Sequence, residues 1–197
     1  MHQRKSKKIL VYFFLLIAVS SISNNSFNNL KLSQIQNINI SGLDQKDNKI
    51  LLVKIKNLIN ENIFFINKNE IIKLIEANSL IEKYQVFKKY PSTISIDIKK
   101  TNFFAKISKN NRIFFIGSNG KLTLAENPND DLPYIFGKPN IKEFLKFKQI
   151  IDKSKFNYKQ IDNLYFFPSN RWDIKLKENI SLKLPANFTL ENLNYLY

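Results

Sequence analysis

The sequence contains no cysteine and little of several other residue types on which active sites depend. Its 197 residues include one histidine, three arginines, four glycines and six prolines. Without cysteine, disulfides, thiolate nucleophiles and cysteine-ligated metals are excluded, and His2 alone forms no zinc site. No Gly-x-Ser-x-Gly elbow, Walker motif or Rossmann glycine pattern occurs. We therefore expect a protein that is not an enzyme, with no cofactor, no metal and no small-molecule substrate.

One acidic group deserves separate consideration as a metal site. Glu126, Asp130 and Asp131 share a loop with Pro128 and Pro133. Hard cations bind carboxylates, but the ligand spacing of an EF-hand loop is absent. The loop is therefore predicted to be a solvated turn.

Acidic residues are scarce, so the formal net charge is +15. Such a charge is typical of proteins that bind nucleic acid or anionic membranes. Lys, Asn, Ile, Phe and Tyr make up more than half of the chain, however, and AT-rich codons specify these residues. Reading of bases normally uses the planar fork of arginine, which is rare here. Coding bias is the preferred explanation, and no nucleic-acid partner is expected.

The N-terminus combines a basic tail, residues 1–8, with an uncharged apolar run that begins at Ile9. This pattern predicts a single transmembrane anchor at 9–23, with a cytoplasmic N-terminus and the rest of the chain facing outward. Because the run is shorter than a full span, a secretory signal cleaved near Ala18-Val19-Ser20 is the alternative. Residues 24–31 form a polar linker. The proposed anchor residues are Ile9, Phe13, Leu16 and Ile22.

The next segment alternates between strand and helix patterns. A strand-like stretch ends at Ser41-Gly42, and helical apolar stripes follow in 44–62 and after Asn67. Segment 81–107 predicts two strands joined by a Tyr90-Pro91-Ser92 turn, because isoleucines alternate with polar residues in its second half. The expected order is β-α-α-β-β, with both helices on one face of the sheet.

The remainder, residues 103–197, contains short strand patterns separated by turns. A hairpin is expected across 109–111, and 143–153 has the apolar stripe of a short helix. Strands are predicted at 161–167, 171–176 and 180–184. The fold class is therefore α+β: a transmembrane helix, a small β-α-α-β-β domain, and a mainly antiparallel β domain with one or two short helices.

Several of these segments resemble a known family. The strand that ends at a glycine, the two short helices and the Val86-Phe87-Lys88-Lys89-Tyr90-Pro91 turn are similar to a POTRA domain. Downstream, Leu132-Pro133, Arg171-Trp172-Asp173 and Leu184-Pro185 occur in the order seen in the bacterial FtsQ/DivIB division family. The resemblance implies a POTRA-like domain at 32–102 and an FtsQ-type β domain at 103–197. The family has a further strand after this point, so either that strand is missing or the sequence is incomplete.

The resemblance implies a non-enzymatic, bitopic scaffold in the inner membrane at the division septum. Its periplasmic domains would bind other division proteins, and an FtsB/FtsL-type complex is the expected partner. The physical route would be strand addition at an open sheet edge near 171–176 and 180–184. For Trp172, packing against the sheet is preferred over a role as an exposed binding anchor. The candidate partner-binding residues are Tyr90, Pro91, Arg171, Trp172, Ile174, Leu176, Leu182 and Leu184.

Two other functions remain open. POTRA-bearing modules also assemble or secrete outer-membrane proteins, although these usually repeat the domain and end in a barrel, which this chain lacks. A cationic periplasmic protein that binds anionic polymers by charge alone would lose that binding in salt.

Overall fold

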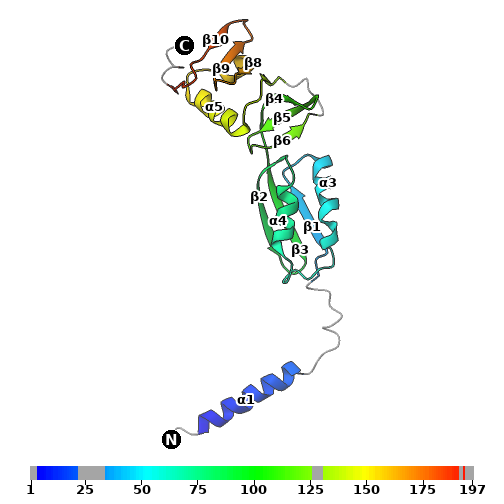
Figure 1. Cartoon of the computed structure of the whole chain (residues 1–197). Coiled ribbons are helices and arrows are strands. Elements are labelled where there is room, and N and C mark those ends of the chain that lie inside the picture. The colour runs from blue at the N-terminus through cyan, green and yellow to red at the C-terminus, as the bar shows by residue number, and fades with distance from the viewer. Residues whose placement is uncertain (1–3, 22–33, 126–130, 191–192, 194–197) are drawn as a thin grey trace.

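Two sheets, each with its own helices, form the body of the molecule (Figure 1). The computed structural model describes residues 4–21, 34–125, 131–190 and 193. Residues 34–100 form the first unit and the described residues from 103 onward form the second unit. Ile22, the predicted linker at 24–31, Glu126 and Asp130 lie outside the described residues. The sequence-based prediction of a β-α-α-β-β domain followed by a strand-rich domain is confirmed.

The predicted membrane anchor forms a helix, α1 (Arg4–Ser21), which includes four basic residues near its start. Its large apolar side chains are exposed, including Ile9, Phe13 and Leu16. In the described parts of the chain, no helix is long and apolar enough to cross a membrane. The predicted anchor at 9–23 overlaps this helix, which has 18 residues.

The first unit is a three-stranded sheet with order β1-β3-β2 and helices on one face (Figure 1). Strand β1 pairs with β3 in parallel, whereas β2 and β3 form an antiparallel hairpin. A parallel pair needs a long crossover, and the two helices provide it. The elements are β1 (Asn37–Ser41), α3 (Gln45–Ile55), the 3₁₀ turn η2 (Lys56–Leu58), α4 (Lys68–Glu76), β2 (Ile81–Lys89) and β3 (Thr93–Lys100).

Alternation along β3 builds the core of the first unit. Ile94, Ile96 and Ile98 are buried against the helices, while Asp97 on the opposite face is exposed. The predicted helical stripes also face this core, which includes Leu51, Ile55, Ile71 and Ile75. Helix α3 ends earlier than predicted, and the chain turns through Asn60 with a positive φ of 76°. Asparagine tolerates this left-handed conformation better than most residues, so the turn shortens the helix.

Gly42 closes β1 where no other residue fits. Its φ is +103°, and a Cβ atom there would lie 1.7 Å from the backbone oxygen of Ile98. The Ser41-Gly42 stop signal in the sequence therefore reflects a close approach between two backbones.

The second unit contains a seven-stranded sheet with order β10-β9-β8-β7-β4-β5-β6. The predicted hairpin across 109–111 is confirmed as β4 and β5, with positive φ at both Asn110 and Asn111. The elements are β4 (Phe103–Lys109), β5 (Arg112–Gly117), β6 (Leu122–Leu124), β7 (Tyr134–Phe136), α5 (Ile141–Lys153), the 3₁₀ turn η3 (Tyr158–Gln160), β8 (Ile161–Phe166), β9 (Trp172–Leu176) and β10 (Ser181–Lys183).

The sheet of the second unit is mainly antiparallel, as predicted, but it also contains parallel pairs that were not predicted. Strand β7 is parallel to β4 on one side and to β8 on the other. Helix α5 is the crossover between β7 and β8, so it packs on the sheet and the two strands must run in the same direction. Phe144, Phe147 and Ile151 of α5 are buried in this core.

Polar contacts join the two units. The side chain of Asn119 donates hydrogen bonds to the backbone oxygens of Ser79 (2.8 Å) and Ile81 (2.9 Å). The Ser118 hydroxyl donates to the carboxylate of Glu82 at 2.9 Å. Because all these groups are at least partly buried, they link the loop between β5 and β6 to the start of β2.

Candidate interaction surfaces

No metal centre is found where the structure is described: no three His, Asp or Glu side chains lie close enough together to hold an ion. Of the loop acids considered in the sequence, Asp131 is described and forms an ion pair with Lys177 at 2.7 Å. The hydrogen bond and charge of Lys177 lower the pKa of Asp131. Asp131 therefore remains ionised near neutral pH and acts in a surface ion pair.

Strand β10 is an edge of the seven-stranded sheet. Among the described residues it pairs only with β9, through Ser181, Leu182 and Lys183 opposite Lys175, Ile174 and Asp173. Flanking bonds run from Leu176 N to the Ile180 oxygen and from Leu184 N to the Trp172 oxygen. Since backbone direction alternates along an antiparallel pair, the N–H and C=O groups of Ser181 and Lys183 point away from β9. An incoming strand could bond to these groups.

The candidate residues of β9 and β10 divide between the core and the surface. Trp172, Ile174 and Leu184 are 3%, 0% and 1% exposed, so these side chains stabilise the sheet and are not available to a partner. The packing role preferred for Trp172 is the one observed. Leu176 and Leu182 are half-buried at the margin of the core.

Arg171 is also half-buried and makes local contacts only. Its Nε atom lies 3.1 Å from the Asp173 carboxylate, and its guanidinium lies over the Phe167 ring. These contacts fix the turn before β9 and leave part of the guanidinium accessible.

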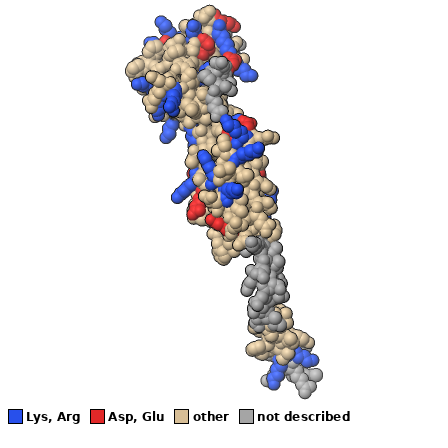
Figure 2. Space-filling view, turned by 90° about the vertical axis from the view of Figure 1, so that its right-hand side faces the viewer, with Lys and Arg blue, Asp and Glu red and all other residues tan. Residues whose placement is uncertain are grey.

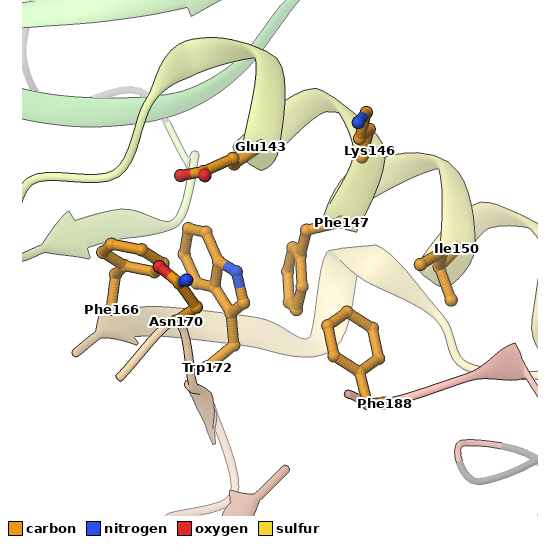
Figure 3. Close-up of a pocket in the computed structure, with 8 residues that line it drawn as sticks. All are labelled: Glu143, Lys146, Phe147, Ile150, Phe166, Asn170, Trp172 and Phe188. Carbon is orange, nitrogen blue, oxygen red and sulfur yellow. The ribbon is translucent and has the colours of Figure 1, made fainter. Parts of the chain in front are cut away.

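An aromatic groove lies between α5 and the end of the sheet that carries Trp172 (Figure 3). Trp172 is sandwiched there by Phe147 and Phe166, with ring centroids 4.5 Å and 4.8 Å away. Phe188 meets Phe147 edge-on from the segment after β10. The hollow has a volume of about 200 Å³. Typical small-molecule sites are larger, at about 300–1,000 Å³. Its size suits one apolar side chain.

Tyr90 and Pro91 are exposed at the turn between β2 and β3, as contact with a partner would require. The Tyr90 ring stacks on Phe64 at 5.1 Å, so the turn lies against the connection between η2 and α4. Phe64 and Phe65 of this connection are 60% and 86% exposed.

The sequence-based predictions assign no role to 63–66, between the two predicted helices, and so miss its two exposed rings. Ile63 and Ile66 are buried, whereas Phe64 and Phe65 between them are not. The available signal was two adjacent phenylalanines inside a connection too short to bury four apolar side chains.

Comparison with known proteins gives a consistent result. The model of the POTRA domain of FtsQ type matches residues 33–100, which correspond to the first unit. The cell division protein FtsQ of Rickettsia bellii is 26% identical over 171 residues, covering 83% of this chain and 61% of the relative. The cell division protein DivIB of Clostridium botulinum strain Loch Maree is 32% identical over 125 residues, covering 61% of this chain and 46% of the relative.

The DivIB protein of Staphylococcus aureus is 29% identical over 118 residues. The chain spans about three fifths of the length of the FtsQ relatives, with 61% covered in Rickettsia bellii and in Rickettsia felis. The matching model covers the first unit, and the FtsQ relatives align over most of the chain, including the second. On these grounds the first unit belongs to the POTRA domains of FtsQ type, and the chain is similar to the FtsQ and DivIB cell division proteins over most of its length.

Proposed function

We propose that this protein is a non-enzymatic scaffold of the bacterial division machinery that holds other division proteins at the septum. Similarity to the FtsQ and DivIB proteins supports the division role. The open edge of β10 is the observation that carries the binding mechanism, because its outward N–H and C=O groups at Ser181 and Lys183 are available for another strand. An FtsB/FtsL-type complex is the proposed partner, from the family resemblance.

In this proposal a partner segment adds to β10 as a further antiparallel or parallel strand. Backbone hydrogen bonds would supply affinity, and pockets for alternate side chains would supply selectivity. Ile180 is 48% exposed beside β10, and the half-buried Leu182 borders the core. Both offer apolar contact to side chains of the added strand. The half-buried Arg171 and Leu176 are proposed as contacts at the periphery of this interface.

We also propose that α1 attaches the protein to the inner membrane and that both units stand in the periplasm. The support is the surface of α1, where Phe13, Phe14 and Leu16 are 61%, 66% and 68% exposed. A contiguous apolar surface of this size is unfavourable in water and typical of membrane or protein contact. The basic residues before Ile9 favour anionic headgroups at the cytoplasmic side.

The test is localisation of an N-terminal fluorescent fusion in dividing cells, compared with a β10-edge variant. Lys183→Pro removes an outward N–H group without touching the bonds to β9, since proline is tolerated on edge strands. Lys183→Ala is the matched control. We expect a band at the constriction for the natural chain and for Lys183→Ala. Purification of each fusion should recover the partner proteins with these two chains and lose them with Lys183→Pro.

Two outcomes would count against the proposal, and they differ. An even signal around the whole envelope for the natural chain contradicts the division role. A septal band with equal partner recovery from Lys183→Pro and Lys183→Ala keeps the division role and refutes strand addition at β10. Circular dichroism of both purified variants checks that the fold is retained.

A further inference from the structure

Phe64 and Phe65 are held outward by a well-bonded loop. The Asn62 side chain accepts a hydrogen bond from the Phe64 N–H at 2.9 Å, and the Asn62 backbone oxygen accepts from Phe65 N and Ile66 N. Ile63 and Ile66, at 0% and 7% exposure, anchor the loop in the core. The exposure of the two rings is therefore imposed by the framework around them.

The β2–β3 turn adds a third ring to this surface. Tyr90 is 58% exposed and stacks on Phe64 with an interplanar angle of 23°. The Lys88 ammonium donates to the Phe64 backbone oxygen, which ties the strand to the loop. We call Phe64, Phe65 and Tyr90 the aromatic tip. Exposing three such rings together to water is unfavourable, so the tip indicates contact with an apolar medium.

The aromatic tip lies at the end of the first unit where the chain arrives from α1. Gln34 forms a bridge with Asn62, and Ile35 N bonds to the Glu61 oxygen. Figure 1 shows this end turned away from the second unit. Residues 22–33 separate it from α1, and twelve residues reach at most about 40 Å. A bilayer that holds α1 is thus within reach of the tip.

The chemistry of the tip suits the headgroup region of a bilayer. Aromatic side chains concentrate at this boundary, where the rings meet acyl chains and polar atoms meet water. The exposed charged residues next in sequence are of both signs, Glu61, Lys68 and Lys89. Figure 2 likewise shows basic and acidic side chains mixed on the visible face of the first unit. Apolar insertion and not charge would therefore drive contact. The projecting rings fit a fluid layer, whereas a protein partner would need a matching hollow.

We infer that the aromatic tip inserts into the surface of the lipid bilayer that α1 occupies, holding the first unit against the membrane. The inference rests on the membrane attachment proposed above. It adds a second contact, made by Phe64, Phe65 and Tyr90, which would fix the orientation of the units and the height of the β10 edge above the membrane.

The absence of native cysteine allows a direct test in the full chain. Phe65→Cys is labelled with a polarity-sensitive fluorophore and reconstituted into phosphatidylethanolamine–phosphatidylglycerol vesicles, with and without lipids that carry a doxyl quencher near the headgroup. Lys109→Cys, exposed at the hairpin of the second unit, is the control. We expect a blue shift and strong quenching at 65, unchanged by salt, and neither at 109.

A second variant measures the contribution of the neighbouring ring. Phe64→Ser is introduced into the Phe65→Cys chain. Because one ring fewer is then buried in lipid, the ratio of chains with an inserted tip to chains with a free tip should fall by about tenfold or more. The Phe64→Ser chain must still float with vesicles, since α1 is unchanged.

Each result has one meaning. A chain that floats but shows no quenching at 65 refutes tip insertion and leaves the attachment of α1 intact. A blue shift without quenching places the ring on protein, either α1 or a second copy, and also refutes the lipid contact. A chain that does not float refutes the attachment and the tip contact together.

Discussion

At the scale of single residues, a buried lysine shows what apolar patterning misses. Lys148 of α5 is only 8% exposed. Its ammonium lies 2.6 Å from an Asp152 carboxylate oxygen, and 4.7 Å and 4.1 Å from the ring centres of Phe104 and Tyr158. The charge is thus paired and covered by two aromatic faces. In sequence, the Lys148–Asp152 spacing is typical of an exposed helix face, so its burial could not be predicted.

Tyr158 gives a residue-scale prediction. Its hydroxyl donates to the Phe104 backbone oxygen at 2.8 Å, and burial, followed by the charge of Asp152, raises its pKa far above the ordinary 10.0. Tyr158→Phe should lower the free energy of unfolding by about 0.5–1.5 kcal/mol at neutral pH through loss of this bond. Urea unfolding monitored by the fluorescence of Trp172 measures it, with Tyr165→Phe as the control.

The same variant has a distinct pH dependence. Because the folded state raises the pKa of Tyr158, its stabilising contribution is complete below pH 10 and is lost as the pH rises above that value. Tyr158→Phe lacks this alkaline loss, so the difference in stability from the natural chain should shrink above pH 10. A constant difference across this range would show that the hydroxyl is not buried.

At the scale of elements, prediction succeeded where one face of a segment is buried. The isoleucines of β3 alternate strictly, and the structure buries all three of Ile94, Ile96 and Ile98. The stripe of α5 was similarly clear. Strand direction was not predictable, because the period of two is the same in parallel and antiparallel strands. The parallel neighbours of β7 follow from the α5 crossover, which is a tertiary feature.

Helix α5 also begins two residues earlier than the predicted 143–153, at Ile141. Asn140 is the N-cap, its side chain accepts from Lys142 N at 3.0 Å, and the Glu143 side chain accepts from Asn140 N. Asn140→Ala should destabilise the second unit by about 1 kcal/mol. Thermal unfolding tests this, and Asn39→Ala, on the exposed face of β1, is the control. Equal melting temperatures for both would contradict a stabilising cap.

The candidate surfaces were predictable only in part. The edge position of β10 agrees with the strand-addition hypothesis, and Tyr90 and Pro91 are exposed. Trp172 and Ile174 lie on β9 and Leu184 directly follows β10, but all three face the core. An aliphatic strand pattern does not distinguish a side chain that packs from one that binds. Phe64 and Phe65 were missed because a short connection has no repeating pattern to show which of its apolar residues are buried.

At the scale of the whole molecule, the junction between the units depends on polar contacts. Glu82 of the first unit accepts a hydrogen bond from Ser118 of the second, and Lys99 lies 3.4 Å from its other oxygen. The Ser118 hydroxyl also contacts the Thr101 hydroxyl at 3.0 Å. Such contacts hold the units in one arrangement without a shared apolar core, so the junction should respond to protonation more than either core does.

The Ser118 hydrogen bond is the main cause of a lowered pKa at Glu82, with Lys99 contributing in the same direction. Because the pKa of Glu82 is lowered in the folded state, its carboxylate stabilises the protein at a pH above the ordinary pKa of 4.5. This contribution is lost as the pH falls below that value. Trp172 is the only tryptophan, so its fluorescence follows the unfolding of the second unit. At neutral pH we expect this transition to coincide with the one followed by circular dichroism. The two transitions should separate in acid.

Glu82→Gln isolates this carboxylate from the others that titrate in acid. The variant should show separated transitions already at neutral pH and little further separation on acidification, because the group that titrates at the junction is gone. Glu70→Gln, at an exposed position of α4, should behave as the natural chain does. If the two unfolding transitions separate in acid to the same extent in Glu82→Gln and in Glu70→Gln, groups other than Glu82 cause the pH dependence. If the natural chain keeps coincident transitions throughout, the junction does not depend on the charge of Glu82.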